Sequence, residues 1–241
     1  MAVSYFSYDD PNSNAQQINS RADQPKSDEK TQIDKTPKEV QAAIIPVSGL
    51  IDDALDYSIR RRTQLAVNDG AEYIIYEVDT YGGLVKSADS ISKYLILEMP
   101  EQPRTVAYVT TNAISAGAMI SVSAEDIIMR RHTTIGDSAP VTMGGKLEGV
   151  EREKAESFIR SIFAKAARAN DYPRPLLEAM VSQQIVVFRV QNRQTGKYTF
   201  FKERNLPDNE EKWNLQNKEL IVAEGELLTL EASKARDFSR I

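Results

Sequence analysis

Residues 73–84 read YIIYEVDTYGGL, an apolar run of β-branched and aromatic residues that ends in a polar turn with two glycines. A short apolar run bounded by such a turn is typical of a buried strand. After the glycines, apolar residues recur at helical spacing at Leu84, Ala88, Ile91 and Leu95. The stretch therefore predicts a strand, a glycine turn and a helix, in that order.

The same alternation of strand and helix continues on both sides of this stretch. An apolar run at 42–47 precedes a helical pattern over 52–68, and a strand at 104–110 precedes a small-residue helix over 112–124. Further on, the patterns predict short strands at 127–129 and 133–135, a helix at 151–169, a hairpin of strands at 185–191 and 197–202, a strand at 218–222 and a short helix from 231. Strands that alternate with helices imply parallel crossovers, so we predict an α/β layer architecture with its site at the carboxyl ends of the strands.

The first 41 residues differ in composition from the rest of the chain. They are rich in Asp, Asn, Ser, Gln and Lys and show no hydrophobic period. Such a segment buries too little apolar surface to offset the entropy lost on ordering it. We predict a disordered N-terminal arm over 1–41 and one folded domain over 42–241, which is long enough to bury a substantial core.

Composition excludes several classes of function. The chain has a net charge of −5, no cysteine and a single histidine, His132. An acidic chain is a poor match for nucleic acid, whose phosphates need a basic surface. Thiolate chemistry and a histidine-rich metal site are excluded, and we expect no metal and no cofactor. The sequence shows neither an apolar run of roughly 18 residues, as a membrane span requires, nor a signal-peptide pattern at its start.

Ser115 is the strongest candidate nucleophile. It follows a predicted strand and a tight turn, and the small residues 116–118 begin the helix behind it. A serine at this place points its hydroxyl into the cleft, beside the unpaired N–H groups of the first helical turn. The alternative is a structural helix N-cap, a position that serine favours. Ser121 and Ser123 lie farther into the helix and are weaker candidates.

Gly82 and Gly83 form a second chemically unusual turn. Two glycines after a strand can present a backbone N–H with no side chain in the way. Together with the Ala116 N–H, this N–H would form an oxyanion hole with two donors. The alternative is a plain strand-to-helix turn, and the pair lacks the spacing of a phosphate-binding loop.

A serine nucleophile needs a base, and the sequence offers three candidates. His132 lies between charged and polar residues, where an exposed structural role is the simpler interpretation. Lys154 shares a helical face with Phe158 and Ile162, so we expect it on a buried apolar stripe. A desolvated lysine can be neutral enough to act as a general base, although a lysine on such a stripe can also extend its amine to water. Lys146, in the preceding glycine-rich loop, is the second lysine candidate.

Several of these segments together resemble a known family. IIPVSGLIDDAL (44–55), YIIYEVDTYGGL (73–84), NAISAGAMISVSAEDIIM (112–129) and TTIGDSAPV (133–141), in this order, are similar to the ClpP-class membrane-associated serine peptidases of the NfeD type. The resemblance covers about residues 43–240 of the chain. It implies the ClpP/crotonase fold, with layered ββα units and a late β-hairpin insertion, and a serine–lysine dyad.

The resemblance assigns a role to each site residue. Ser115 matches the nucleophile of the family, Lys154 the general base, and Gly82 and Gly83 with the Ala116 N–H the oxyanion hole. The absence of a histidine at the place where the histidine–aspartate branch of the class has one favours the lysine mechanism.

Two loops depart from the family pattern. DTYGG lacks the proline that more often precedes the glycines, which alters the stiffness of the loop but keeps both backbone donors. Asp137 and Ser138 replace smaller residues, which predicts a narrower or more polar acyl pocket. The sequence also lacks the signal sequence, membrane helices and C-terminal barrel of many relatives, as a fragment or a truncated relative would.

The leading functional hypothesis is a serine endopeptidase that cleaves extended apolar peptide segments with no cofactor. The resemblance extends the substrates to segments of membrane-associated proteins, and it implies a homo-oligomer located at a membrane or in the periplasm. Two alternatives stay open. One is a catalytically inactive relative that binds a partner as a scaffold, and the other is a crotonase-type enzyme that acts on acyl-CoA thioesters.

Overall fold

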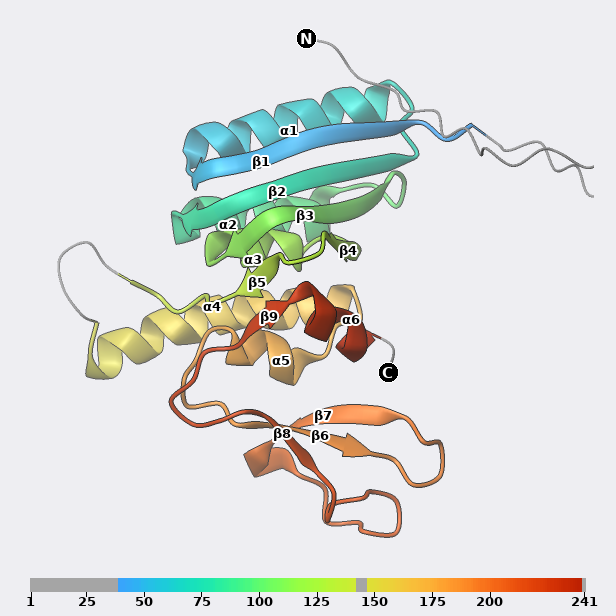
Figure 1. Cartoon of the computed structure of the whole chain (residues 1–241). Helices are drawn as coiled ribbons and strands as arrows, with labels where there is room; N and C mark the ends of the chain where they lie inside the picture. The colour runs from blue at the N-terminus through green and yellow to red at the C-terminus, as the bar shows by residue number, and fades with distance from the viewer. Residues whose placement is uncertain (1–38, 142–146, 240–241) are drawn as a thin grey trace, which may run out of the picture.

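The computed structural model describes residues 39–141 and 147–239, which form a mixed α/β fold (Figure 1). The predicted arm over 1–41 lies outside the described residues up to position 38. The main sheet has six strands in the order β1-β2-β3-β5-β9, with β4 also paired to β3. The strands are β1 (Ala42–Ile51), β2 (Tyr73–Gly83), β3 (Arg104–Ile114), β4 (Asp126–Met129), β5 (Thr134–Gly136) and β9 (Thr229–Glu231).

The pairings confirm the predicted parallel crossovers. Every strand pair of the main sheet is parallel except β5 with β9. The strands run farther than their apolar cores suggest, because β3 extends to Ile114 and its residues 112–114 pair with 134–136. The helix predicted over 112–124 is therefore wrong at its start: α3 spans Ala116–Ser121, since the backbone groups before it find partners in the sheet.

Helices pack side by side against the main sheet. They are α1 (Asp53–Asn68), α2 (Val85–Lys93) and α3, and the π-helix η1 (Tyr94–Glu98) continues α2. Alternate residues of β2, namely Ile74, Tyr76 and Val78, are fully buried beneath this layer. This two-residue period is the expected pattern for a strand with one face in the core.

Along β1 and β2, the opposite face of the sheet is exposed among the described residues. On β1, Ile44 and Leu50 are 48% and 66% exposed, and on β2 Tyr73 and Tyr81 are 38% and 78% exposed. Parallel sheets are normally covered on both faces, so these exposed side chains mark a part of the sheet that the described residues leave uncovered. β1 is also the edge strand, and it carries Pro46 near its middle.

Two helices follow the main strands. The long helix predicted over 151–169 is confirmed as α4 (Gly149–Ala169), and α5 (Arg174–Ala179), which has no clear period in the sequence, packs beside it. The Asn170 side-chain amide donates to the carbonyls of Val122 at 3.0 Å and Ala124 at 2.8 Å, so the end of α4 is tied to the end of α3. Figure 1 places the start of α4 on the side of the molecule where β1 and β2 end.

A small antiparallel sheet completes the domain. It consists of β6 (Val187–Gln191), β7 (Tyr198–Lys202) and β8 (Glu219–Val222), in the order β7-β6-β8, and a 3-10 turn, η2 (Glu203–Asn205), follows β7. The predicted hairpin is confirmed as β6 and β7, with five residue pairs in register. The C-terminal helix α6 (Ala232–Ser239) then packs against the hairpin, with the rings of Phe200 and Phe238 5.0 Å apart. Among the described residues, no helix is long and apolar enough to cross a membrane.

Candidate active site

Ser115 occupies a strained turn between β3 and α3. Its backbone has φ 57°, a left-handed conformation that few residues other than glycine adopt. The Ser115 N–H donates to the Gly136 carbonyl at 3.0 Å, and the Met119 N–H donates to the Ser115 carbonyl at 3.2 Å. These two bonds hold the turn at both ends. The Ser115 side chain makes no N-cap hydrogen bond to α3, so the capping interpretation is not supported here.

Gly82 lies directly against Ser115. A β-carbon built on Gly82 would lie 2.8 Å from Ser115 Cβ, 3.1 Å from Ser115 Oγ and 3.3 Å from the Ala116 nitrogen. Its φ of 116° is also strained for a residue with a side chain. The structure therefore brings together three of the predicted site residues, Ser115, Gly82 and Ala116, and only a glycine fits between them.

Gly83 faces the other way, toward β1. It pairs with Ile51, and a β-carbon on Gly83 would overlap the Ile51 backbone. The two glycines thus serve two close approaches: Gly82 lets the turn reach Ser115, and Gly83 lets the same turn reach β1. Each needs a glycine for packing reasons that are independent of any oxyanion.

Thr80 is a site residue that the sequence analysis missed. Its hydroxyl donates to the Gly49 carbonyl at 2.5 Å and accepts from the Gly82 N–H at 3.0 Å. Its methyl group would lie 2.6 Å from a β-carbon built on Gly117. Thr80 therefore fixes the glycine turn relative to both β1 and α3. Its only sequence signal was its position two residues before the glycine pair, which is too weak to separate it from an ordinary turn residue.

The hydrogen bond to Thr80 bears on the expected oxyanion hole. The Gly82 N–H already has the Thr80 hydroxyl as its acceptor, so it is not a free donor for the expected oxyanion hole. Ala116 is the first residue of α3, where helix geometry supplies no carbonyl to its N–H.

The loop after β5 supports the serine turn from the far side. Ser138 is buried, and its hydroxyl lies 3.3 Å from the Ser115 carbonyl and 3.3 Å from the Gly136 carbonyl. The Ser138 N–H donates to the Met180 carbonyl at 2.6 Å, which ties the loop to the end of α5. Asp137 between them is exposed, with φ 44°. Two polar residues, Asp137 and Ser138, were predicted to alter the acyl pocket. One of them, Ser138, contacts the Ser115 backbone and supports the turn.

Lys154 does not lie on a buried stripe, and that expectation is wrong for the single chain. Lys154 is exposed and Phe158 is 48% exposed, whereas Ile162 is buried. The buried stripe of α4 passes through Ile159, Ile162, Phe163 and Ala166, and one turn earlier it reaches Ala155 and Glu156 rather than Lys154. The Lys154 side chain makes no hydrogen bond or ion pair among the described residues.

A shallow hollow surrounds Lys154 on α4. Val150, Lys154 and Phe158 line it together with Ser157 and Ser161. The other lysine candidate, Lys146, lies outside the described residues. Ser115 and Lys154 thus belong to different elements, and no contact joins them in the described chain.

The remaining candidates are either exposed or already hydrogen-bonded within a helix. His132 is 89% exposed in the turn between β4 and β5, and its ring nitrogen lies 3.6 Å from a Glu231 carboxylate oxygen. The hydroxyls of Ser121 and Ser123 are buried and donate to helix carbonyls, so they are not available as nucleophiles. No group of three or more potential metal ligands occurs within the described ranges.

Comparison with known proteins agrees with this architecture. The family model of the NfeD1b N-terminal domain matches residues 41–207. Membrane protein NfeD1b of Bacillus subtilis (strain 168) is 32% identical over 192 residues, which are 80% of this chain and 36% of that protein. The chain therefore spans about a third of the length of this relative.

Two solved structures share the fold. Both are described as the 1510-N membrane-bound stomatin-specific protease: a serine-to-alanine mutant, and a lysine-to-alanine mutant in complex with a substrate peptide. The first is 21% identical with a TM-score of 0.54 and covers 61% of this chain and 72% of its own. The second is 17% identical with a TM-score of 0.59 and covers 85% and 75%. The family match covers more than half of the described chain, and the fold agrees with it, so this protein belongs to the NfeD1b family, with the ClpP-like α/β fold of its N-terminal domain.

Proposed function

We propose that this chain is a serine endopeptidase that cleaves extended apolar peptide segments, with Ser115 as its nucleophile. The observation that carries the proposal is the strained Ser115 turn, which has no capping bond and is braced on three sides by Gly82, Gly136 and Ser138. A strained backbone conformation persists only where many surrounding contacts hold it in place, and such positions cluster at active sites.

The proposed oxyanion donors are the N–H groups of Ala116 and Gly83. As Ser115 Oγ bonds to the carbonyl carbon of the substrate, the carbonyl oxygen becomes an anion that these two donors stabilise. Gly82 and Thr80 act indirectly, because they set the position of the turn that carries Gly83. This role differs from the first expectation, in which either glycine could donate.

Lys154 is the proposed general base. Its neutral amine takes the proton from Ser115 Oγ, and the resulting ammonium gives that proton to the leaving amine as the peptide bond breaks. Water then attacks the acyl-enzyme, with Lys154 taking its proton and Ser115 regaining a hydrogen. An exposed lysine is fully hydrated, so the active state requires an apolar cover over the hollow of Val150, Lys154 and Phe158. An apolar substrate segment or a second copy of the chain would supply it.

The relatives guide the proposed substrates and location. One related protein is named a membrane protein, and the structural neighbours are named proteases of a membrane-bound kind. We therefore propose segments of membrane-associated proteins as substrates, and action at a membrane or in the periplasm as a homo-oligomer.

Labelling with a fluorophosphonate and cleavage of a fluorogenic apolar peptide test the nucleophile. We expect Ser115→Ala to abolish labelling and to reduce cleavage at least about a thousandfold, with the thermal midpoint nearly unchanged. Ser58→Ala, on α1 and outside the hollow around Lys154, is the matched control and should keep both. If the native protein neither labels nor cleaves, the partner-binding scaffold is the better description; if it turns over an acyl-CoA thioester instead, it is a crotonase-type enzyme.

Lysine variants test the base separately. Lys154→Ala and Lys154→Arg should be equally inactive, because a guanidinium does not lose its proton in the accessible pH range. Lys165→Arg, on an exposed position of the same helix, should keep full activity. Activity in Lys154→Arg, or loss of activity only in Lys146→Ala, would assign the base elsewhere.

A further inference from the structure

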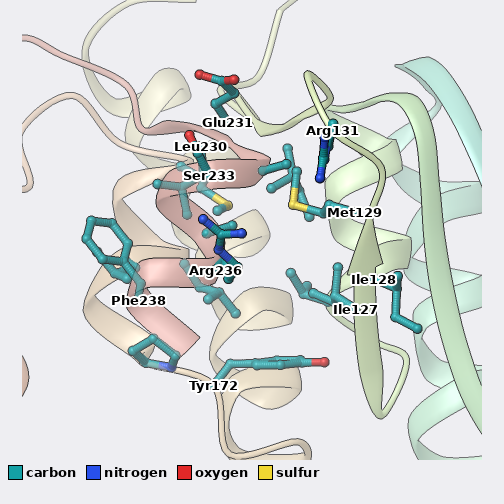
Figure 2. A pocket seen from close by; sticks show the side chains of 18 of the residues that line it. Ile127, Ile128, Met129, Arg131, Tyr172, Leu230, Glu231, Ser233, Arg236 and Phe238 are labelled. Carbon is teal, nitrogen blue, oxygen red and sulfur yellow. The ribbon is translucent and has the colours of Figure 1, made fainter. Parts of the chain in front are cut away.

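A second cavity lies away from the Ser115 turn, between β4, α5 and α6 (Figure 2). Its volume is about 670 Å³, which falls within the range of ligand sites. None of the residues proposed for catalysis, Ser115, Gly83, Ala116 and Lys154, lines it. The proposed peptidase therefore leaves this cavity without a role.

The cavity lies beside a part of the main sheet that lacks an outer strand. β4 and β5 both pair with β3, on the side of β3 that β2 leaves free. β9 pairs with the outer side of β5, but the chain then turns into α6 at Ala232, whose N–H donates to the Thr133 carbonyl at 3.0 Å. Among the described residues no strand pairs with the outer side of β4, and α6 lies across the cavity from it (Figure 2).

The backbone of β4 offers hydrogen bonds on this outer side. The N–H and C=O groups of successive residues in a strand point to opposite sides, so every second residue faces the same neighbour. The Arg130 N–H donates to the Val109 carbonyl at 3.0 Å, so Arg130 and Ile128 face β3, whereas Ile127 and Met129 face away from it. Within the described part of the chain, no hydrogen bond occupies the backbone groups of Ile127 and Met129. An added strand would find two donors and two acceptors there, two residues apart.

The side chains around these backbone groups are mostly apolar. Leu176 and Leu177 of α5 line the cavity from one element, and Phe238 of α6 lines it from another. The Tyr172 hydroxyl is already bonded to two backbone carbonyls, at 3.2 and 3.0 Å, so Tyr172 offers a ligand only its ring. A ligand in this cavity therefore meets apolar walls beside a row of unpaired backbone groups.

Charged residues lie at one end of the cavity, but they do not select a ligand of one sign. Arg131 and Glu231 carry opposite charges, and Glu231 lies 3.6 Å from His132. Arg236, which also lines the cavity, already has an interaction partner in the chain. The unpaired backbone groups and the apolar walls, not the charges, therefore define the occupant.

We infer that this cavity is the docking site of an extended apolar segment of a partner protein, which adds to the edge of β4 as a further strand. Its N–H and C=O groups pair with those of Ile127 and Met129, and its side chains pack against Leu176, Leu177 and Phe238. A single-chain lipid would leave the backbone groups of β4 unpaired, and the backbone groups of a helix are already bonded to one another. This inference is independent of the proposed peptidase.

Amide NMR of the Ser115→Ala protein, titrated with a blocked heptapeptide of alternating valine and threonine, tests the inference directly. The amide signals of Ile127 and Met129 should shift and saturate with peptide. Their exchange with solvent should slow at least about tenfold, because each N–H gains an acceptor. Ile128 is the internal control: its N–H already faces β3, so its exchange should change much less.

N-methylated forms of the heptapeptide separate strand addition from apolar contact alone. A form methylated on every nitrogen keeps the side chains but has no donors, and it should bind at least about tenfold more weakly. Of the two forms methylated on alternate nitrogens, each keeps one free edge, and at least one should bind nearly as well as the unmodified peptide. Apolar contact alone predicts the opposite order, because methylation makes the peptide more apolar. Equal or tighter binding of the fully methylated form would overturn the inference.

Two tryptophan variants of α6 locate the peptide in the cavity. Ser233→Trp places an indole in the lining and should abolish binding of the heptapeptide. Lys234→Trp, on the next residue and outside the lining, should bind it as the parent protein does. Both positions are exposed, so the fold is expected to survive either change. Equal effects of the two variants would contradict docking at this place.

Other occupants would give different results in the same experiments. Tighter binding of dodecanoate, used below its micelle concentration, than of the heptapeptide would make the cavity a lipid site. Slow exchange at Ile127 and Met129 before any peptide is added would assign the edge to the chain's own residues 1–38 if deleting them abolishes it, or to a second copy if dilution does. Each of these results, or the absence of saturable shifts, would overturn the inference. None of them bears on whether Ser115 cleaves peptides.

Discussion

The geometry around Ser115 depends on two glycines, which carry no side chain. Gly82 and Gly117 lie where a β-carbon would meet Ser115 on one side and Thr80 on the other. Because Thr80 also holds the Gly82 N–H and the Gly49 carbonyl, three chain segments are fixed within one small volume. A change of one methyl group at this place must therefore move the serine.

Gly82→Ala tests this tight fit. The new methyl group would lie 2.8 Å from Ser115 Cβ on a backbone with φ 116°, so we expect a loss of about 2 kcal/mol of stability and at least a hundredfold loss of kcat/KM. Gly196→Ala also places a side chain at a positive φ, here 73°, but with nothing within 4 Å, and should lose only about 1 kcal/mol with no change in activity. Thermal unfolding and steady-state kinetics give both quantities. Full activity in Gly82→Ala would show that Ser115 tolerates displacement.

Sequence reasoning found the serine turn more reliably than its partners. A serine between a strand and a run of small residues is a local pattern, and the turn forms where that pattern predicts. Lys154 could not be placed in this way, because a shift of one residue in the helical stripe changes a side chain from buried to exposed. Thr80 acts through contacts with Gly49 and Gly117, which are distant in sequence, and no local pattern records such contacts.

At the scale of elements, most strands and helices were predictable, the short β4, β5 and β8 included, whereas α5 and the end of β3 were not. β1 to β3, α1 and α4 each carry a sustained hydrophobic period, and all were predicted as the right type. α5 has six residues and depends on tertiary packing against α4, which overrides weak local preference. The end of β3 was read as helix because Asn112 and Ala113 have little strand preference until β5 pairs with them.

An ion pair joins the small sheet to α5 and is suited to a double-mutant test. Lys202 of β7 contacts the buried Glu178, which also accepts from Arg174 at 2.7 Å. Desolvation, with the nearby cations Arg204, Arg174 and Arg160, lowers the pKa of Lys202 to about 8. Burial of this pair therefore carries a penalty in desolvation free energy, even though the two charges attract each other.

Removing one member of this pair should destabilise the domain more than removing both. Lys202→Met leaves Glu178 with Arg174 alone, and we expect a loss of about 3 kcal/mol. The double variant Lys202→Met with Glu178→Leu should recover most of that loss, as measured by denaturant unfolding. Additive losses in the double variant would mean that the two side chains stabilise the domain through separate contacts.

At the scale of the whole molecule, the open face of the main sheet predicts self-association. Ile44, Leu50 and Tyr81 are exposed on a parallel sheet, the kind of sheet that is normally covered on both faces. Association through this face would remove these apolar side chains from water.

Ile44→Asp tests the interface without touching the proposed site. Light scattering during gel filtration should show a dimer or larger assembly for the native chain and a monomer for Ile44→Asp, because a buried unpaired carboxylate opposes association. Leu97→Asp is the control, since Leu97 is 71% exposed on η1 rather than on the open face, and it should keep the native mass. A native chain that stays monomeric at about 100 μM would contradict the predicted interface.

Pro46 has a consequence for the solubility of the chain. β1 is an edge strand with the apolar sequence AAIIPVSGLI, which without its proline would be a ready template for fibril growth. A residue with no N–H interrupts the row of donors that an incoming strand would need. Pro46→Val should therefore leave the folded domain intact yet shorten the lag before thioflavin-positive fibrils appear at elevated temperature. On this prediction the proline acts as a gatekeeper against pairing of two copies of the chain along their edge strands.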